Sequence, residues 1–101
     1  MLSAQFHILF ALLDGEKHGY AIMKAVQDDT RGRLKLGPAT LYTNLKKMLA
    51  QGLIAETEKE EQDERRRHYR LSDQGRTQVE EQLKQMEATL LLAQQKRTMK
   101  S

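Results

Sequence analysis

The side chains that could support catalysis or hold a metal ion are scattered along this chain. Its three histidines, His7, His18 and His68, lack the close spacing of metal ligands on one helix or loop. The absence of cysteine removes thiol catalysis, disulfides and the common structural zinc sites. The acidic stretch 56–64 has neither the glycine nor the ligand spacing of a calcium loop. We therefore expect no enzyme, cofactor or metal, with a three-histidine site assembled by folding as the minor alternative.

Charge is segregated along the sequence. Residues 30–55 contain five lysines or arginines and no acid, residues 56–64 contain six acids, and residues 65–70 contain four arginines. The formal net charge of +3 and the pI of about 9.3 are common values, so the distribution is more informative than the total. Clustered cations can neutralise the phosphates of nucleic acid. A solvated basic surface with no ligand is the alternative.

Apolar spacing predicts the helices that carry these charges. A helix over residues 3–13 is apolar on two faces, and a second helix over residues 18–28 follows a polar turn at 14–17. A helix that is apolar on two sides is buried on two sides. One small domain can hardly provide that, so we expect the first helix to touch a second subunit. Its two faces are Phe6, Leu9, Phe10 and Leu13, then Ile8 and Leu12.

A third helix is predicted to follow the connection at 30–37 and to begin at Pro38, because proline suits the first helical position. It ends near Gln51, with Gly52 just beyond. Steps of about 100° per residue separate an inward stripe from an outward face. The stripe is Leu41, Leu45, Met48 and Leu49; the outward face is Thr40, Thr43, Lys46, Lys47 and Ala50, flanked by Tyr42 and Asn44.

Two short β-compatible segments, 53–60 and 65–71, come next, joined by a polar link at 61–64. Ser72 is a suitable cap for a fourth helix that runs to about Gln95. The order is three helices, a hairpin and one long helix. This is the plan of a winged helix-turn-helix, mainly α with a small β-hairpin (α+β). No apolar run approaches the ~20 residues of a membrane span.

The long helix carries an apolar seam with spacings of 4, 3, 4 and 3 residues: Val79, Leu83, Met86, Leu90 and Ala93. A helix of this length outruns so small a core, which favours packing against a partner subunit over packing on its own domain. We expect a DNA-binding domain over residues 1–72, and a dimerisation helix over residues 73–101 that ends in a frayed tail from Lys96.

DNA binding needs cations for phosphates, an element that fits the major groove and side chains that reach base edges. The third helix offers hydroxyls and lysines for these roles, and arginines leaving the hairpin tip can follow the backbone or enter a minor groove. The acids at 56–64 either face away from DNA or lower its non-specific affinity. The expected DNA-binding residues are Lys35, Pro38, Thr40, Tyr42, Thr43, Lys46, Lys47, Arg65, Arg66 and Arg67.

Taken together, these segments resemble the PadR family of bacterial transcriptional regulators, especially its short members with a single C-terminal dimerisation helix. The resemblance covers about residues 6–83. It rests on HGYAI at 18–22, LGPATLY at 36–42, LKKM at 45–48, GLI at 52–54 and RRRHYRLSDQGR at 65–76. It implies a homodimer whose C-terminal helices pack against the partner, including its first helix, and operator binding near promoters, usually as a repressor. Some short members bind planar hydrophobic drugs between the subunits through a tryptophan, which this chain lacks.

The sequence therefore predicts a cytoplasmic regulator that binds a palindromic site on double-stranded DNA as a homodimer, with no signal peptide and no membrane partner. A winged helix whose basic face binds an acidic protein is the alternative. A small hydrophobic effector could enter between the subunits, although the residues that would line its pocket also suit a plain interface core. The expected dimer-interface residues are Phe6, Phe10, Val79, Leu83, Met86 and Leu90.

Overall fold

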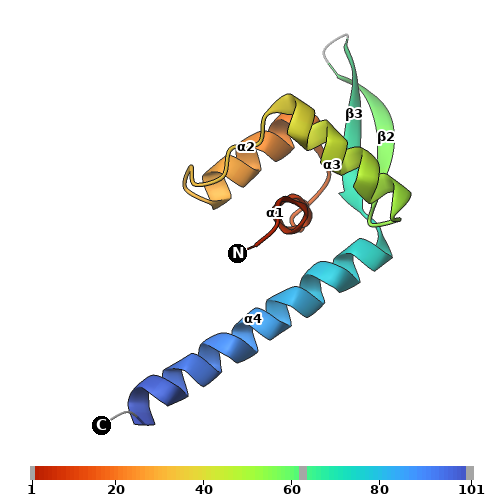
Figure 1. The fold of residues 1–101 in the computed structure, drawn as a ribbon. Coiled ribbons are helices and arrows are strands. Elements are labelled where there is room, and N and C mark those ends of the chain that lie inside the picture. The colour runs from red at the N-terminus through yellow and green to blue at the C-terminus, as the bar shows by residue number, and fades with distance from the viewer. Residues whose placement is uncertain (1, 62–63, 100–101) are drawn as a thin grey trace.

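The computed structural model describes residues 2–61 and 64–99, and for residues 59–61, 64 and 65 it describes the backbone alone. Four helices and a three-stranded antiparallel sheet form an elongated molecule of 63 × 28 × 21 Å (Figure 1). The predicted order of three helices, a hairpin and a long helix is confirmed, and so is the mainly helical α+β class. The elements are α1 (Ala4–Ala11), β1 (Lys17–His18), α2 (Gly19–Asp29), α3 (Pro38–Ala50), β2 (Ile54–Glu61), β3 (Glu64–Leu71) and α4 (Asp73–Met99).

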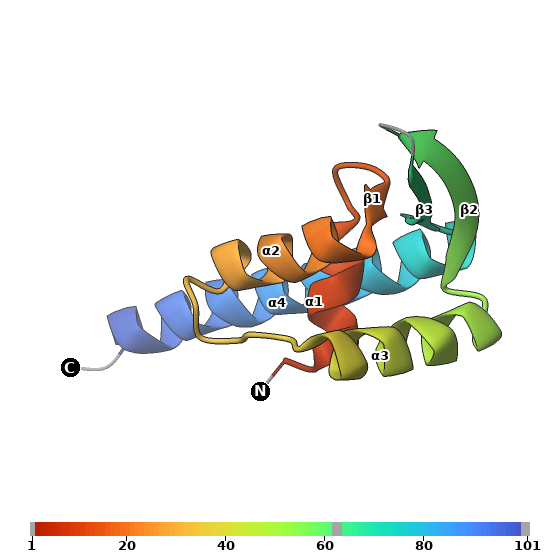
Figure 2. The same cartoon turned by 90° about the horizontal axis from the view of Figure 1, so that it is seen from above.

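Helix α1 is the centre of the fold. It contacts α2, α3 and α4, and in the view from above it lies between α2 and α3 with α4 beneath (Figure 2). Ile8 and Leu12, on its second apolar face, are 0% and 1% exposed within the single chain. The argument that two-sided burial requires a second subunit was therefore wrong, whereas the expected contact of α1 with a second subunit stays a prediction. Three neighbouring helices of the same chain bury both apolar faces of α1 in part, with Phe6, Ile8, Leu9 and Ala11 buried.

Capping residues mark the ends of α2 and α3. His18 Nδ1 accepts a hydrogen bond of 3.2 Å from the amide of Ala21 at the start of α2. Pro38 occupies the first turn of α3, as predicted, and Gly37 precedes it as the N-cap. Beyond α3, Gly52 has a φ of +74°, and the amide of Leu53 donates to the carbonyl of Met48 over 3.0 Å. This is a Schellman motif with glycine at its left-handed position.

Strand β1 was not predicted. It has two residues, pairs antiparallel with β3, and sets Lys17 opposite Tyr69 and His18 opposite His68. The sheet order is β1-β3-β2, so β3 is the central strand and the hairpin is anchored to the helical body. Two residues are too few to show the alternation by which a strand is recognised in sequence, and the polar residues around Lys17 read as a turn.

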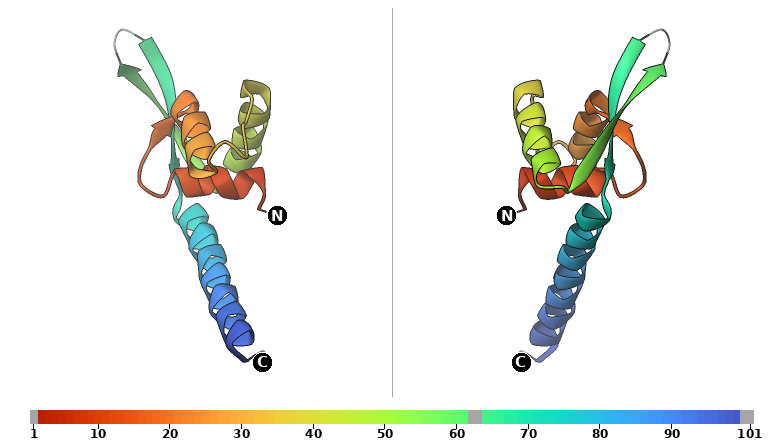
Figure 3. Two further views of the ribbon diagram at one scale, coloured as in Figure 1. Left: turned by 90° about the vertical axis from the view of Figure 1, so that its left-hand side faces the viewer. Right: turned by 90° about the vertical axis from the view of Figure 1, so that its right-hand side faces the viewer.

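Strands β2 and β3 form the wing of a winged helix. Their register pairs Ile54 with Leu71 at the base and Glu58 with Arg67 further out. Residues 62 and 63, in the predicted polar link, lie outside the described part of the chain. The end of β2, the beginning of β3 and the start of α3 lie at one end of the molecule, and the end of α4 lies at the other (Figure 3).

Helix α4 continues to Met99, so the prediction of a frayed tail from Lys96 was wrong for residues 96–99. Lys96 and Arg97 lie in the last turn, where positive charge is favourable next to the free carbonyls of a helix. At the other end Ser72 caps α4 as predicted, since Ser72 Oγ accepts from the amide of Gly75 over 3.0 Å. The same hydroxyl donates to the carbonyl of Gly52 over 2.6 Å, which ties α4 to the end of α3.

Candidate nucleic-acid interface

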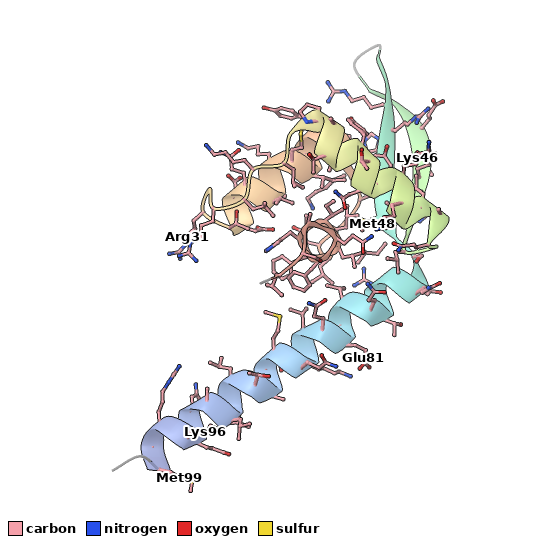
Figure 4. All side chains as sticks on the ribbon, in the orientation of Figure 1. Arg31, Lys46, Met48, Glu81, Lys96 and Met99 are labelled. Carbon is pink, nitrogen blue, oxygen red and sulfur yellow. The ribbon has the colours of Figure 1, made fainter. Side chains whose placement is uncertain are left out.

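The outward face of α3 is polar and basic, as its spacing predicts. Thr40, Thr43, Lys46 and Lys47 are all exposed, whereas Leu41, Leu45 and Met48 are buried in the core. Figure 4 shows Lys46 and Met48 on opposite sides of the helix. The buried stripe fixes the rotation of α3 about its axis, so the two threonines and two lysines must face solvent together.

Tyr42 lies over the first residue of α2. A Cβ placed on Gly19 would lie 2.5 Å from Tyr42 Oη, so this glycine allows the two helices to approach closely. The tyrosine is 49% exposed and shares the rim of the outward face. Asn44, at the other flank, donates to the carbonyl of Thr40 within α3 over 2.8 Å. Tyr42 is thus available to a ligand, while the Asn44 amide is engaged within its own helix.

The segment leading into α3 presents Lys35 and Pro38 to solvent. Between them Leu36 is 9% exposed and packs into the core, which anchors the segment. The neighbouring Gly37 adopts extended backbone with a φ of −73°. Lys35 is therefore an exposed cation three residues before the start of α3.

Arg66 and Arg67, two of the three predicted wing arginines, do not share one surface. Successive residues of a strand point to opposite faces, so Arg66 faces away from Arg67. Arg66 is half-buried and its Nη1 lies 3.3 Å from His18 Nε2, at the base of β1. Arg67 is exposed on the face of the sheet that is turned toward α3. Arg65 lies in β3, but its side chain is outside the described part of the chain.

A cleft of about 390 Å³ separates α3 from the wing. Lys46 lines it from the helix, and Arg67 and Glu56 line it from the sheet. Sequence reasoning placed the acids of 56–64 away from DNA or used them to weaken non-specific binding. Glu56 stands opposite Tyr69, which lines the same cleft, so Glu56 lies on the side of the wing that faces α3. The cleft therefore combines two cations with one acid.

Tyr69 forms the floor of this cleft and was not predicted as a site residue. It is 2% exposed. Burial, followed by the neighbouring Glu56 carboxylate, raises the pKa of Tyr69 above its ordinary value of 10.0, and Arg67 opposes this rise. The hydroxyl therefore stays protonated at neutral pH and can serve as a hydrogen-bond donor. The signal that could have identified Tyr69 is its pairing with Glu56 across the wing. That pairing depends on the strand register, which the sequence alone does not show.

The residues of the apolar seam on α4 differ in how far they are exposed to solvent. Val79 is 0% exposed and Leu83 is partly buried, whereas Met86 and Leu90 are 39% and 56% exposed. Of the predicted interface residues on α1, Phe6 is buried at 4% and its ring stacks on the half-buried Phe10. Phe6 and Val79 thus have almost no surface left to bury against a partner. Sequence reasoning omitted two further exposed apolar residues of α4, Leu91 and Leu92, because they lie outside the 4-3 spacing.

Among the residues whose side chains the structure describes, no group of three or more histidine or acidic side chains could hold a metal ion. His18 and His68 do come together, with ring centroids 5.7 Å apart, but His7 belongs to a different contact, against Phe6. No helix in the described part of the chain is both long and apolar enough to cross a membrane.

Comparisons with known proteins agree with this geometry. The model of a family described as transcriptional regulator PadR-like matches residues 8–81. A PadR family transcription regulator from Clostridium difficile R20291 superposes with a TM-score of 0.75 at 25% identity, over 90% of this chain and 94% of that one. A transcriptional regulator from Clostridium thermocellum gives a TM-score of 0.73 at 24% identity, over 91% and 90% of the two chains. A comparison with curated protein sequences gives no match.

One of the similar structures contains DNA. Bacillus subtilis PadR, solved in complex with operator DNA, superposes with a TM-score of 0.71 at 24% identity. The match covers 78% of the present chain and 45% of the Bacillus subtilis chain. The shared part is therefore the winged-helix fold, and more than half of the larger protein has no counterpart in the superposition.

Proposed function

Because this chain belongs to the transcriptional regulator PadR-like family, we propose that it binds a specific DNA sequence as a homodimer and represses transcription from the promoters it occupies. We place it in the cytoplasm, where that DNA lies. The observation that carries the proposal is the outward face of α3, defined as Thr40, Thr43, Lys46 and Lys47, standing beside the wing.

The proposed complex places α3 in the major groove. Thr43 offers a methyl group to thymine and a hydroxyl to bases or phosphates, and the two lysines can neutralise phosphates or donate to guanine. Lys46 and Arg67 would hold the phosphate backbone that runs through the cleft between α3 and the wing. The operator complex of Bacillus subtilis PadR supports DNA as the ligand of this fold.

The proposed homodimer uses the exposed part of the α4 seam. Two recognition helices must reach successive major grooves, ~34 Å apart, to read a palindromic site. Met86 and Leu90 leave apolar surface on a helix that projects beyond its own domain, which favours a second copy as the covering partner (Figure 1). Phe10 is the α1 residue with surface left for that contact.

An effector site remains a separate proposal. A small hydrophobic molecule could enter between the subunits, lined by Phe10, Met86 and Leu90, because methionine adapts to varied shapes. Such a ligand can act only by binding the two DNA-affinity states of the dimer unequally. Phe10→Ala or Met86→Ala should then change its effect more than it changes operator binding without ligand.

The test of the proposed function is a DNA titration with the double variant Lys46→Ala, Lys47→Ala. Specific sequences are first selected from a random duplex pool, and affinity is then measured by fluorescence anisotropy between about 50 and 200 mM salt. Each lost phosphate contact lowers the slope of log affinity against log salt by about 0.9, so a double loss should lower it by nearly two. Lys84→Ala, Lys96→Ala on α4 is the control, since it removes the same charge far from the cleft.

Two results would overturn the proposal. One is selection that yields no preferred sequence, which would favour the alternative of an acidic protein partner. The other is an equal loss of affinity in both double variants, which would mean that total charge matters and the position of α3 does not.

A further inference from the structure

Two histidines from different strands meet at the base of the wing. His18 in β1 stands opposite His68 in β3, and their ring centroids lie 5.7 Å apart in an edge-on arrangement. His68 is 6% exposed, and its Nδ1 lies 3.3 Å from the carbonyl oxygen of Arg66. A carbonyl only accepts hydrogen bonds, so in this contact Nδ1 of His68 is the donor. His68 is thus bonded within its own strand, whereas His18 also contacts α2.

Each ring nitrogen of His18 faces a hydrogen-bond donor. Nδ1 accepts from the amide of Ala21 over 3.2 Å, which caps α2. Nε2 lies 3.3 Å from Nη1 of Arg66, and a guanidinium group carries donors alone. A neutral imidazole has one acceptor nitrogen, and a protonated imidazole has none. His18 can therefore satisfy one of the two donors at a time while it is neutral, and neither of them once it is protonated.

The two donors belong to the two parts of the proposed DNA-binding face. Gly19, the first residue of α2, lies against Tyr42 of α3, because a Cβ added to the glycine would be 2.5 Å from Tyr42 Oη. Arg66 precedes Arg67, which lines the cleft between α3 and the wing. His18 therefore joins the helix that lies against α3 to the strand that carries Arg67.

We propose that His18 and Arg66 are positioning residues that hold the wing in place relative to α3, and that protonation of His18 releases this contact. Protonation removes the remaining acceptor of the ring and places its charge beside the Arg66 guanidinium, so the two side chains repel each other. Histidine side chains ordinarily change charge between about pH 5 and 8, so the wing should be held less firmly at the lower pH. An effect on operator affinity rests on the proposed function, but release of the contact does not.

Glu16, just before β1, is an acidic neighbour of this contact. Its Oε1 accepts a hydrogen bond from Thr57 Oγ1 on β2 over 3.4 Å, and the register places Thr57 on the same face of the wing as Arg66. The Glu16 carboxylate favours a protonated His18, and the Arg66 guanidinium disfavours it. Lys59 stands opposite Arg66, but its side chain is outside the described part of the chain. The pH at which the contact opens is therefore set by the balance of these charges.

Other charged or titratable neighbours of His18 come from β1, α2 and β3. Lys17 forms an ion pair with Asp14, and alternation along the strand turns the lysine to the opposite face. The ring of Tyr20 stacks on His18 with centroids 6.5 Å apart. Arg70 is exposed on this face of β3. Among the side chains that the structure describes, positive charge therefore predominates around the ring.

The first experiment follows the free chain by NMR between about pH 5 and 8. We expect the amide signal of Ala21 and the guanidinium signal of Arg66 to shift with the same midpoint as the His18 ring, because both donors lose their acceptor together. Arg66→Gln removes the neighbouring charge, so the midpoint of the His18 ring should move to higher pH. Lys24→Gln removes an exposed cation elsewhere on α2 and should leave the midpoint in place. Donor signals that do not follow the ring, or an unchanged midpoint in Arg66→Gln, would overturn the proposal.

The second experiment measures affinity for the selected duplex at about pH 8 and about pH 5.5, at constant ionic strength. Affinity should fall about three- to tenfold at the lower pH, as for the loss of one hydrogen bond. His18→Asn can still cap α2 but cannot take up a proton, so this pH dependence should disappear. His7→Asn, on α1, is the matched control and should keep it.

Two results of the second experiment would refute the proposal. One is a pH dependence that persists in His18→Asn, which would assign it to His68. The other is a higher affinity at the lower pH that His18→Asn abolishes, which would mean that the protonated ring contacts a phosphate. A failure to select any preferred duplex would contradict the proposed function alone, since the NMR titration contains no DNA and still tests the contact.

Discussion

Helices α3 and α4 differ in how much of their apolar surface is buried within their own chain. Helix α3 buries Leu41, Leu45 and Met48 in the core and turns threonines and lysines to solvent, so most of its apolar stripe is buried within one chain. Helix α4 buries Val79 near its start, whereas Leu90, Leu91 and Leu92 further along are 56%, 57% and 50% exposed. An exposed polar face suits a ligand that comes and goes, whereas an exposed apolar face indicates a permanent partner.

The largest effect should come from making the α4 seam polar. Leu90→Asp places a charge on apolar surface that we assign to the dimer, and because Leu90 is 56% exposed in the single chain, the domain itself should still fold. A monomer cannot engage two half-sites at once, so operator affinity should fall by about 100-fold or more. Sedimentation and DNA titration measure the two consequences.

Gln85→Asp, on another face of α4, is the matched control and should remain dimeric. A monomeric Leu90→Asp variant that binds the operator at full strength would remove the distinction between the two helices. It would mean that α3 alone supplies the affinity.

An intermediate effect is expected at Gly75, where α4 joins the wing. A Cβ at this position would collide with the carbonyl oxygen and carbon of Leu53, which are backbone atoms and cannot swing away. Helix propensity alone would make Gly75→Ala more stable by about 1 kcal/mol, whereas overpacking of this kind typically destabilises by about 1–3 kcal/mol. We expect the steric term to dominate and the free energy of unfolding, measured in urea, to decrease.

Gln78→Ala in the same helix is the comparison for Gly75→Ala, because it is exposed and should be nearly neutral. Should Gly75→Ala prove more stable than the parent chain, α4 must be able to move away from Leu53. Helices α3 and α4 would then be joined less rigidly than the hydrogen bonds of Ser72 imply.

The smallest effect concerns the acid in the cleft beside α3. Glu56→Gln removes a negative charge from the cleft that Lys46 and Arg67 also line, where the DNA backbone is proposed to pass. Affinity for non-specific duplex DNA should rise about two- to fivefold at low salt, with less gain at high salt because of screening. Glu81→Gln, which removes a charge from α4, is the control (Figure 4). A similar gain from Glu81→Gln would show that only net charge matters.

The parts of the fold that follow a helical period could be predicted from sequence, and the parts that depend on register or on tertiary enclosure could not. The stripe of α3 repeats over thirteen residues, so Thr40, Thr43, Lys46 and Lys47 were placed correctly on its outward face. Ser72 was recognised because the cap is a local interaction. The consecutive wing arginines were treated as one group, although a strand necessarily separates Arg66 from Arg67.

Tertiary contacts explain the remaining differences. Strand β1 forms because β3 pairs with it, and a segment of two residues carries no sequence pattern from which that pairing could be predicted. Burial of α1 on two sides was taken to need another subunit because the sequence cannot show that three helices of the same chain pack around it. A hollow between the start of α1 and the α2–α3 connection likewise brings together Leu2 and Leu34, residues that are distant in sequence.

The two hydrogen bonds of the Ser72 hydroxyl couple the direction of α4 to the end of α3. The hydroxyl bonds to the carbonyl of Gly52 just beyond α3 and to the amide of Gly75 inside α4, so the two helices turn together at that joint. A helix of 27 residues is about 40 Å long, and a tilt of about 5° at its base therefore displaces its far end by about 3–4 Å. In the proposed homodimer the same geometry would link the contact between subunits to the spacing of the half-sites on DNA. A shift of a few ångströms at the far end of α4 would rotate each DNA-binding domain by only a few degrees, so the dimer would tolerate little change in the distance between half-sites.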